Sequence, residues 1–269
     1  MKKDNAKEFK ITPKMKAKIA AMFSSAAIGG AVLLGGHGVA HALSVSTNVK
    51  ATSPVLSASV TLSASQQQTH LENIISKGDQ EITRRLTTLN SLTSKINSAS
   101  KLTPSDQATL SAEVSGTITG LTSLKTQLDA ETTLLPARSD AESIYSEYRV
   151  YALLAPKVGL IKVADDQQVI ETKLSAIVPK LQSRITLATN DGKNTTTIQA
   201  QLNDMSAKIS AAQAISSNIE SVVINLQPTD YNANHSVLLG DNAQLKTAYS
   251  DIQDAYADAK SIVSELEAL

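Results

Sequence analysis

The stretch TTTIQAQLNDMSAKISAAQAISSNIESVVINL, residues 195–226, decides the fold class of this chain. Its apolar side chains recur every three or four residues, the spacing of one helix face and, when sustained, of a coiled-coil seam. The heptad positions are Ile198, Leu202, Met205, Ile209, Ala212, Ile219, Val223 and Leu226. The turn Asn190-Asp191-Gly192 precedes it, Asn194 or Thr195 can cap its first turn, and Gln227-Pro228-Thr229-Asp230-Tyr231 breaks it.

The same spacing continues on both sides of this stretch. It predicts helices from about Gln66, from the Thr103-Pro104-Ser105-Asp106 start signal to about Leu135, over 137–154, through the stripe at 169–185, and from about Asp241 to the end. The first stripe is Leu71, Ile75, Ile82, Leu89, Leu92 and Ile96, with Gly78 and Arg85 as imperfect members. The later stripes are Leu110, Val114, Leu121, Leu124 and Leu128; then Val169, Ile170, Leu174, Ile177, Leu181 and Ile185; and finally Leu245, Ala248, Ile252, Ala255, Ala259, Ile262, Leu266 and Leu269. Pro136 ends or kinks a helix, while Pro156 and Pro179 each start or kink one.

We therefore expect an all-α fold of antiparallel helical hairpins forming a coiled-coil-like bundle. Predicted core positions in the first half of the chain recur 88 residues later in the second half, as in the pairs Ile82 and Ile170, Leu110 and Ile198, and Leu121 and Ile209. Duplication of a three-helix unit, with units at 66–160 and 161–269, explains this offset. Two unrelated hairpins slid into register explain it too, and heptads of this length also allow pairing between chains.

The N-terminus has the composition of an export signal. Residues 1–42 combine seven lysines with an apolar, glycine-interrupted stretch, AAMFSSAAIGGAVLLGG, and end in Ala40-His41-Ala42. Ala40 and Ala42 occupy the small-residue positions that a signal peptidase recognises, with cleavage before Leu43. An uncleaved membrane anchor is the alternative, although Gly and Ala make it marginal. Residues 43–65, rich in Ser and Thr, are expected to form a flexible tether.

Charge and composition exclude several classes of protein. The 25 basic and 25 acidic residues balance overall, but seven basic and two acidic ones lie in 1–42, so the remainder has a net charge of about −5. A nucleic-acid binder needs a basic face, and a helix that lies on a membrane needs a basic amphipathic stripe. The absence of cysteine excludes disulfides, so stability must come from packing.

The sequence shows no recognisable catalytic, cofactor or metal-binding constellation. Outside the leader its histidines are His70 and His235, without metal-ligand spacing, and it has no phosphate-binding glycine loop. Asp165-Asp166 form an acidic pair, and Asp251, Asp254 and Asp258 form an acidic stripe. Carboxylates with the spacing of this stripe are typical of a solvated face that binds a divalent ion weakly at most. We therefore expect no catalytic residue, no cofactor and no metal.

Tyrosines carry the sharper hypothesis. Tyr145, Tyr148 and Tyr151 recur every third residue, and Tyr249 and Tyr256 are seven apart, so each set can line one side of a helix. Such strips are a possible contact surface for a protein or glycan partner. The alternative is that the rings lie at the core margin with their hydroxyls in water.

Three segments carry a resemblance to known sequences: LTPSDQ from Leu102, IYSEYRVYALLAPKVGLIKVADDQQVIETKL and VINLQPTDYN. Over about 78–269 the chain resembles an uncharacterised family of exported all-helical proteins from candidate-phyla (Saccharibacteria-like) bacteria. The resemblance implies a secreted bacterial helical protein and no particular activity. We expect a non-enzymatic protein of the cell envelope or extracellular space with a structural or protein-interaction role. A coiled-coil regulator of cell-wall enzymes, or a membrane-anchored stalk, is the alternative.

Overall fold

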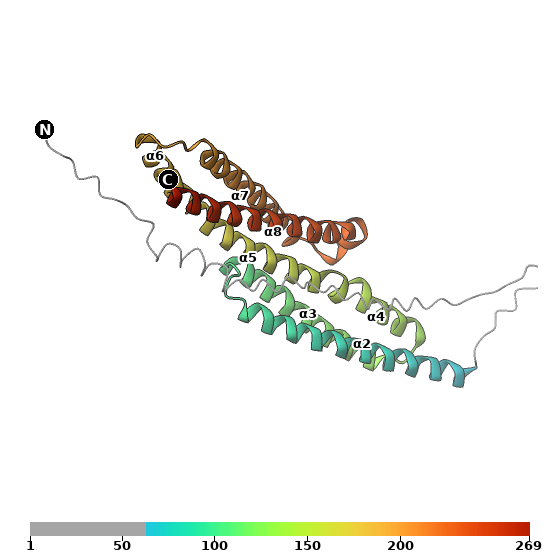
Figure 1. The fold of residues 1–269 in the computed structure, drawn as a ribbon. Coiled ribbons are helices and arrows are strands. Elements are labelled where there is room, and N and C mark those ends of the chain that lie inside the picture. The colour runs from blue at the N-terminus through green and yellow to red at the C-terminus, as the bar shows by residue number, and fades with distance from the viewer. Residues whose placement is uncertain (1–62) are drawn as a thin grey trace, which may run out of the picture.

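The computed structural model describes residues 63–269, apart from the side chains of 232–235. The predicted signal peptide, with Ala40 and Ala42, and most of the predicted tether lie outside the described residues. The described part is helical without a strand (Figure 1). Its elements are α2 (Ala64–Ser98), α3 (Pro104–Ala130), α4 (Leu134–Ser146), the π-helical turn η1 (Val150–Leu154), α5 (Ala155–Ser175), α6 (Val178–Asn190), α7 (Thr196–Val223), the 3₁₀ turn η2 (Pro228–Asp230) and α8 (Tyr231–Ala268). Among these helices none combines the length and apolarity that a membrane crossing requires.

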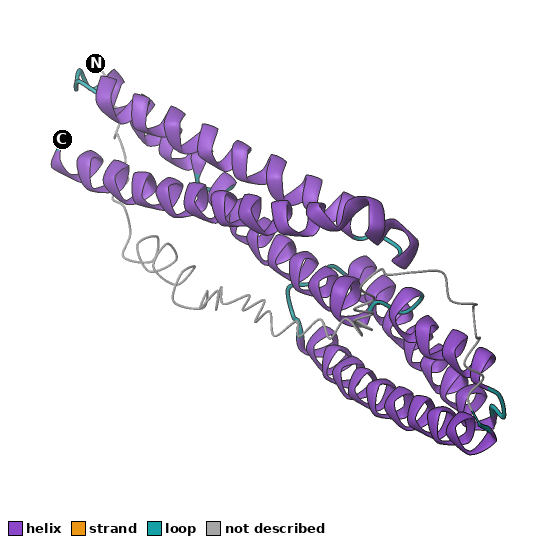
Figure 2. Ribbon diagram, turned by 90° about the vertical axis from the view of Figure 1, so that its right-hand side faces the viewer, coloured by secondary structure: helices purple, strands orange, loops and turns teal. Residues whose placement is uncertain are grey.

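The helices form an elongated molecule (Figures 1 and 2). It has two hydrophobic cores, and we call the helices around each core the first and the second bundle. The first core joins α2, α3, α4 and the N-terminal half of α5 to the junction of α7 and α8. The second core joins the C-terminal half of α5 to α6, α7 and α8. In Figure 1, α5 runs between the α2–α3 hairpin and the α7–α8 hairpin. The predicted all-α architecture of antiparallel hairpins is confirmed, and α5 belongs to both cores.

The predicted apolar stripes form these cores. All eight heptad positions of 195–226 are buried, and Gly78 and Arg85 are buried members of the α2 stripe. Three predicted stripe members are not buried core residues. Ile75 is half-buried against the first core, Val169 is half-buried, and Leu269, at the chain end, is 41 % exposed.

Helix ends follow local chemistry at most of the predicted boundaries. Thr103 caps α3, its Oγ1 accepting a bond from the Asp106 amide at 3.1 Å. Pro156 and Pro179 lie in the first turns of α5 and α6, so both start a helix. Gly192 provides the positive φ of 78° at the turn before α7.

Three predicted boundaries are wrong. The second helix ends at Ala130 rather than near Leu135, because the polar stretch with two β-branched threonines at 131–133 leaves the helix and Pro136 fits the first turn of α4. The third helix is interrupted by Arg149, whose φ is +34°. The last helix starts at Tyr231 instead of Asp241. Buried Leu238 anchors this early part in the first core, which outweighs the low helix propensity of its Asn and Gly residues.

The offset of 88 links positions that are buried in both hairpins. In α3 and α7 the pairs Leu110 and Ile198, Val114 and Leu202, and Leu121 and Ile209 are all buried. The counterpart of α2 is interrupted, since α5 ends at Ser175 and α6 begins at Val178. The predicted unit boundary between 160 and 161 falls inside α5.

Candidate functional site

The predicted tyrosine strip is divided between two sides of the first bundle. The Tyr145 and Tyr151 rings both cover the guanidinium of Arg85 on α2, at 4.7 and 5.1 Å from their centroids. Tyr148 instead lies against α3, where a Cβ added at Gly120 would come within 2.6 Å of its ring. The break at Arg149 separates the three residues, so they do not line one helix face. That part of the strip prediction is wrong.

Tyr145, Arg85 and Tyr151 form a solvent-facing group that we call the Tyr–Arg stack. Arg85 is 4 % exposed, whereas Tyr145 and Tyr151 are 56 % and 45 % exposed. The guanidinium also pairs with Glu81, and Thr88 donates a hydrogen bond to the Tyr151 hydroxyl at 3.3 Å. Partial burial, and secondarily the Glu81 carboxylate, raise the pKa of Tyr145 above its usual value. The stack is a fixed aromatic surface whose buried cation is already paired.

Tyr249 and Tyr256 lie on a different bundle. Both are half-buried on the part of α8 that forms the second core, and Tyr256 packs against that core. The Lys260 ammonium lies 5.7 Å from the Tyr256 ring centroid. The core-margin interpretation therefore fits Tyr256, while Tyr145 and Tyr151 remain the exposed aromatic pair.

A second group of interest is buried where the two bundles meet. Lys157 of α5 is fully buried; its ammonium is 2.6 Å from the Glu113 carboxylate of α3 and donates to the Leu226 carbonyl at 3.0 Å. Gln167 of α5 donates to the Leu245 carbonyl of α8 at 2.9 Å. These bonds connect α5 to elements on both of its sides.

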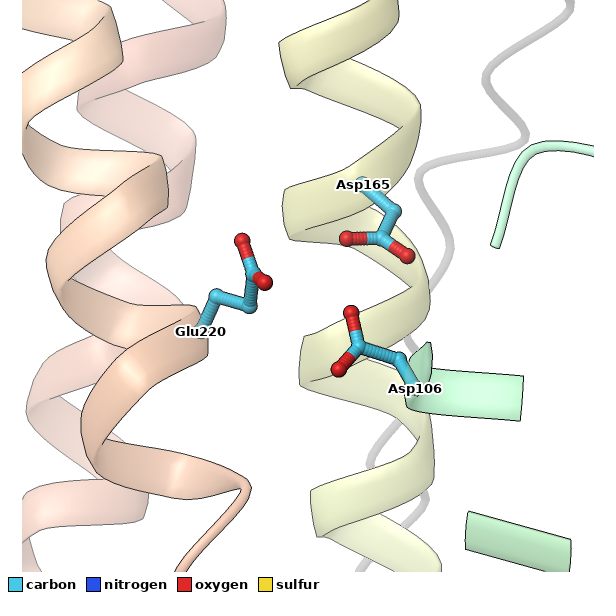
Figure 3. Close-up of side chains that lie close together, drawn as sticks. All are labelled: Asp106, Asp165 and Glu220. Atoms are coloured by element: carbon cyan, nitrogen blue, oxygen red, sulfur yellow. The ribbon is translucent and has the colours of Figure 1, made fainter. Parts of the chain in front are cut away.

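Three carboxylates, which we call the acidic triad, complete this junction. Asp106 comes from the first turn of α3, Asp165 from the middle of α5 and Glu220 from the end of α7. One oxygen of each lies within 4.8 Å of the others, and the three groups point toward one another (Figure 3). Asp106 and Asp165 are 6 % and 1 % exposed, and Glu220 is half-buried.

Neutral donors hold the triad in place. The Thr103 amide donates to Asp165 Oδ2 at 2.8 Å, the Thr103 hydroxyl donates to Asp106 Oδ2 at 2.7 Å, and Gln168 donates to Glu220. In a capping box, the side chain at the third helical position, here Asp106, would accept a hydrogen bond from the backbone amide of the N-cap residue, here Thr103. Here Asp165 accepts it, which leaves Asp106 facing the other two carboxylates. Burial, with lesser repulsion from neighbouring acids, raises the pKa of Asp165 to about 6.

Sequence reasoning found only part of this arrangement. The sequence indicates Asp165-Asp166 only as an acidic pair. In the structure Asp165 is buried, while Asp166 is half-buried and pairs with Lys162 at 2.7 Å. Asp106 was expected as a capping-turn acid, and Glu220 was not singled out. Only a weak feature of the sequence could have indicated that Asp165 is buried. It follows Ile161 by four residues, which places both on the same helix face, but many other residues of that helix are polar. The predicted stripe Asp251, Asp254 and Asp258 lies apart, with Asp258 paired to Lys208 at 3.1 Å.

Comparisons with known proteins add no relative. No family model, no curated sequence and no solved structure matched the chain. The resemblance to an exported bacterial family therefore stays a prediction from the sequence.

Proposed function

We propose that this is an exported, non-enzymatic helical-bundle protein that binds a protein partner at the bacterial cell envelope or outside the cell. The Tyr–Arg stack is the observation that carries the proposal. The leader at 1–42 supports the compartment, and the long helical surfaces support a binding role rather than a catalytic one.

The stack has the properties of an interface anchor. Tyrosine and arginine are enriched among the residues that dominate binding energy, and tyrosine buries a large amphipathic surface with only two rotatable side-chain bonds. Tyr145 and Tyr151 are held by Arg85 and Thr88 before any partner arrives, so little side-chain entropy is lost on binding. Their exposed faces and hydroxyls offer apolar contact together with hydrogen bonding.

Site-specific photo-crosslinking tests the binding role. A photoreactive phenylalanine analogue replaces Tyr151 in protein added to intact cells and to envelope fractions. We expect a discrete crosslinked protein band that the Tyr145→Ala change weakens at least tenfold. The matched control places the analogue at Leu187 of α6, which is 53 % exposed in the other bundle and should give no such band. Equal crosslinking at both positions, or none, contradicts a partner site at the stack.

The compartment is tested separately by the mass of the N-terminus. We expect chains beginning at Leu43 in the medium or cell-wall fraction. Chains that keep residues 1–42 and stay with membranes would instead make the helices a membrane-anchored stalk. Intact chains in the cytoplasm would contradict export.

A further inference from the structure

We propose that Asp106, Asp165 and Glu220 bind one hard divalent cation, preferentially Ca²⁺, which links α3, α5 and α7 at the junction of the two bundles. Binding of this cation would require only the chain itself, so it is independent of export and of any partner.

The spacing of the triad fits a calcium ion. Calcium binds oxygen ligands at roughly 2.3–2.6 Å, so two ligands on opposite sides of the ion are about 4.8 Å apart. The three candidate oxygens all lie within 4.8 Å of one another. Magnesium demands near-ideal octahedral geometry and usually keeps several waters, with one or two protein carboxylates, so a site with three protein carboxylates favours calcium. The purely carboxylate donor set also disfavours zinc, which prefers His and Cys ligands.

An unsatisfied buried oxygen points independently to a ligand. Asp165 is 1 % exposed, and its Oδ1 has no hydrogen-bond partner, although its Oδ2 accepts the Thr103 amide. Figure 3 shows the Asp165 carboxyl directed into the space shared with Asp106 and Glu220. A buried carboxylate oxygen without a donor is costly, and a cation would satisfy it.

The local charge also favours a cation. Among the described residues, no lysine or arginine forms an ion pair with a member of the triad; nearby Lys101 and Lys162 both pair with Asp166, at 3.9 and 2.7 Å. The donors that do reach the triad belong to Thr103 and Gln168 and are neutral. Three carboxylates this close therefore repel one another unless they bind protons or a metal ion.

A bound ion would strengthen the contact between the two bundles. Its ligands come from the start of α3 in the first bundle, from the shared helix α5 and from the end of α7. Three carboxylates fill part of the six to eight positions that calcium takes, and water would complete the rest. We therefore expect an affinity in the range of extracellular calcium modules, about 0.1–1 mM.

Calcium titration of the purified, chelator-treated protein tests the proposal. We expect a single site in isothermal titration calorimetry. Because ligands that bind the folded state raise its stability, 10 mM CaCl₂ should raise Tm by about 3–10 °C over an equal ionic strength of KCl. MgCl₂ should raise it less. No binding heat and no Tm shift with Ca²⁺ would overturn the proposal and leave protons as the neutralising species.

Variants that neutralise one carboxylate separate metal binding from a purely structural role, because they should lower calcium affinity without lowering Tm in the absence of calcium. Glu220→Gln and Asp165→Asn each remove repulsion, so in the absence of calcium we expect an unchanged or higher Tm. Both should lose calcium affinity at least tenfold. Asp166→Asn, which makes the same charge change at a neighbouring position paired with lysines, should retain the calcium response. Equal loss of the response in Asp166→Asn would mean nonspecific screening and would overturn the site.

Discussion

Glu171 of α5 is completely buried, and its side-chain partner in the described part of the chain is Ser216 of α7, whose hydroxyl lies 3.0 Å from both carboxyl oxygens. That hydroxyl is also 3.0 Å from the Ala212 carbonyl. Burial raises the pKa of Glu171 to about 7. If the Ser216 proton goes to Ala212, a protonated Glu171 can donate to the serine oxygen, which satisfies both groups without a buried charge.

This arrangement predicts a loss of stability as pH rises. The pKa of Glu171 is about 7 in the folded state and 4.5 in the unfolded state. The free energy of unfolding therefore falls by about 3 kcal/mol in total as the pH rises from the lower pKa to the higher one. Glu171→Gln should remove this contribution, leave the smaller loss that comes from Asp165, whose pKa is raised to about 6, and be more stable than wild type at pH 8. Urea unfolding at pH 5 and pH 8 measures the difference. The control Glu142→Gln changes an exposed acid of α4 and should follow wild type; the same pH dependence in Glu171→Gln would contradict the assignment.

Substituting alanine at two glycines, Gly78 and Gly116, should change the stability of the protein in opposite directions. A Cβ at Gly78 would lie 2.3 Å from Leu128 Cδ2 in the first core, whereas one at exposed Gly116 meets nothing within 4 Å. Gly78→Ala should destabilise the protein by about 1–3 kcal/mol through overpacking. Gly116→Ala should stabilise it by up to about 1 kcal/mol, since alanine favours a helix. Chemical denaturation of both variants checks the signs, and a stabilised Gly78→Ala would show that α2 and α3 are not so closely packed.

At the scale of elements, apolar periodicity predicted the helices because most of each stripe faces a single core. Positions such as Ile198, Leu202 and Met205 could be assigned from spacing alone. Two of the three boundaries that failed were set by a tertiary contact or an unusual backbone. Leu238 extends α8 toward the N-terminus by packing in the first core, and Arg149 breaks the third helix at a positive φ that its sequence does not announce.

The candidate sites were harder to predict because they form between elements. Tyr145 and Tyr151 were predicted, but their convergence on Arg85 depends on the break that follows α4. Asp106, Asp165 and Glu220 lie far apart in sequence, and no spacing rule places α3, α5 and α7 at one point. Ser216 was visible as a polar residue at a seam position between Ala212 and Ile219, the kind of signal that marks a buried polar contact.

Replacing the glycine in the turn between α6 and α7 should lower the stability of the protein. Gly192 has a φ of +78°, which an L-residue with a side chain adopts at a cost of roughly 1–2 kcal/mol. No atom would contact a Cβ there, so Gly192→Ala should lose about that much stability through backbone strain alone. Gly159→Ala, which also meets open space but lies inside α5, is the control and should be neutral or stabilising. Equal stability changes for the two alanine variants in urea unfolding would contradict the strain argument.

At the scale of the whole molecule, α5 makes the two bundles depend on each other. Its first half contributes Val158, Leu160 and Ile161 to the first core, and its second half contributes Ile170 and Leu174 to the second. The end of α7 and the start of α8 likewise complete the first core. Unfolding the second bundle would therefore remove part of the first core as well.

This coupling predicts one cooperative unfolding unit. Ile82→Ala in the first core and Ile209→Ala in the second should each cost about 2–5 kcal/mol and shift a single transition. Hydrogen exchange gives the sharper test, because Ile209→Ala should speed exchange of the most protected α2 amides roughly 30-fold or more, although Ile209 lies in the other bundle. If α2 exchange stays unchanged while α7 and α8 accelerate, the bundles unfold separately and α5 is a linker between two independent units.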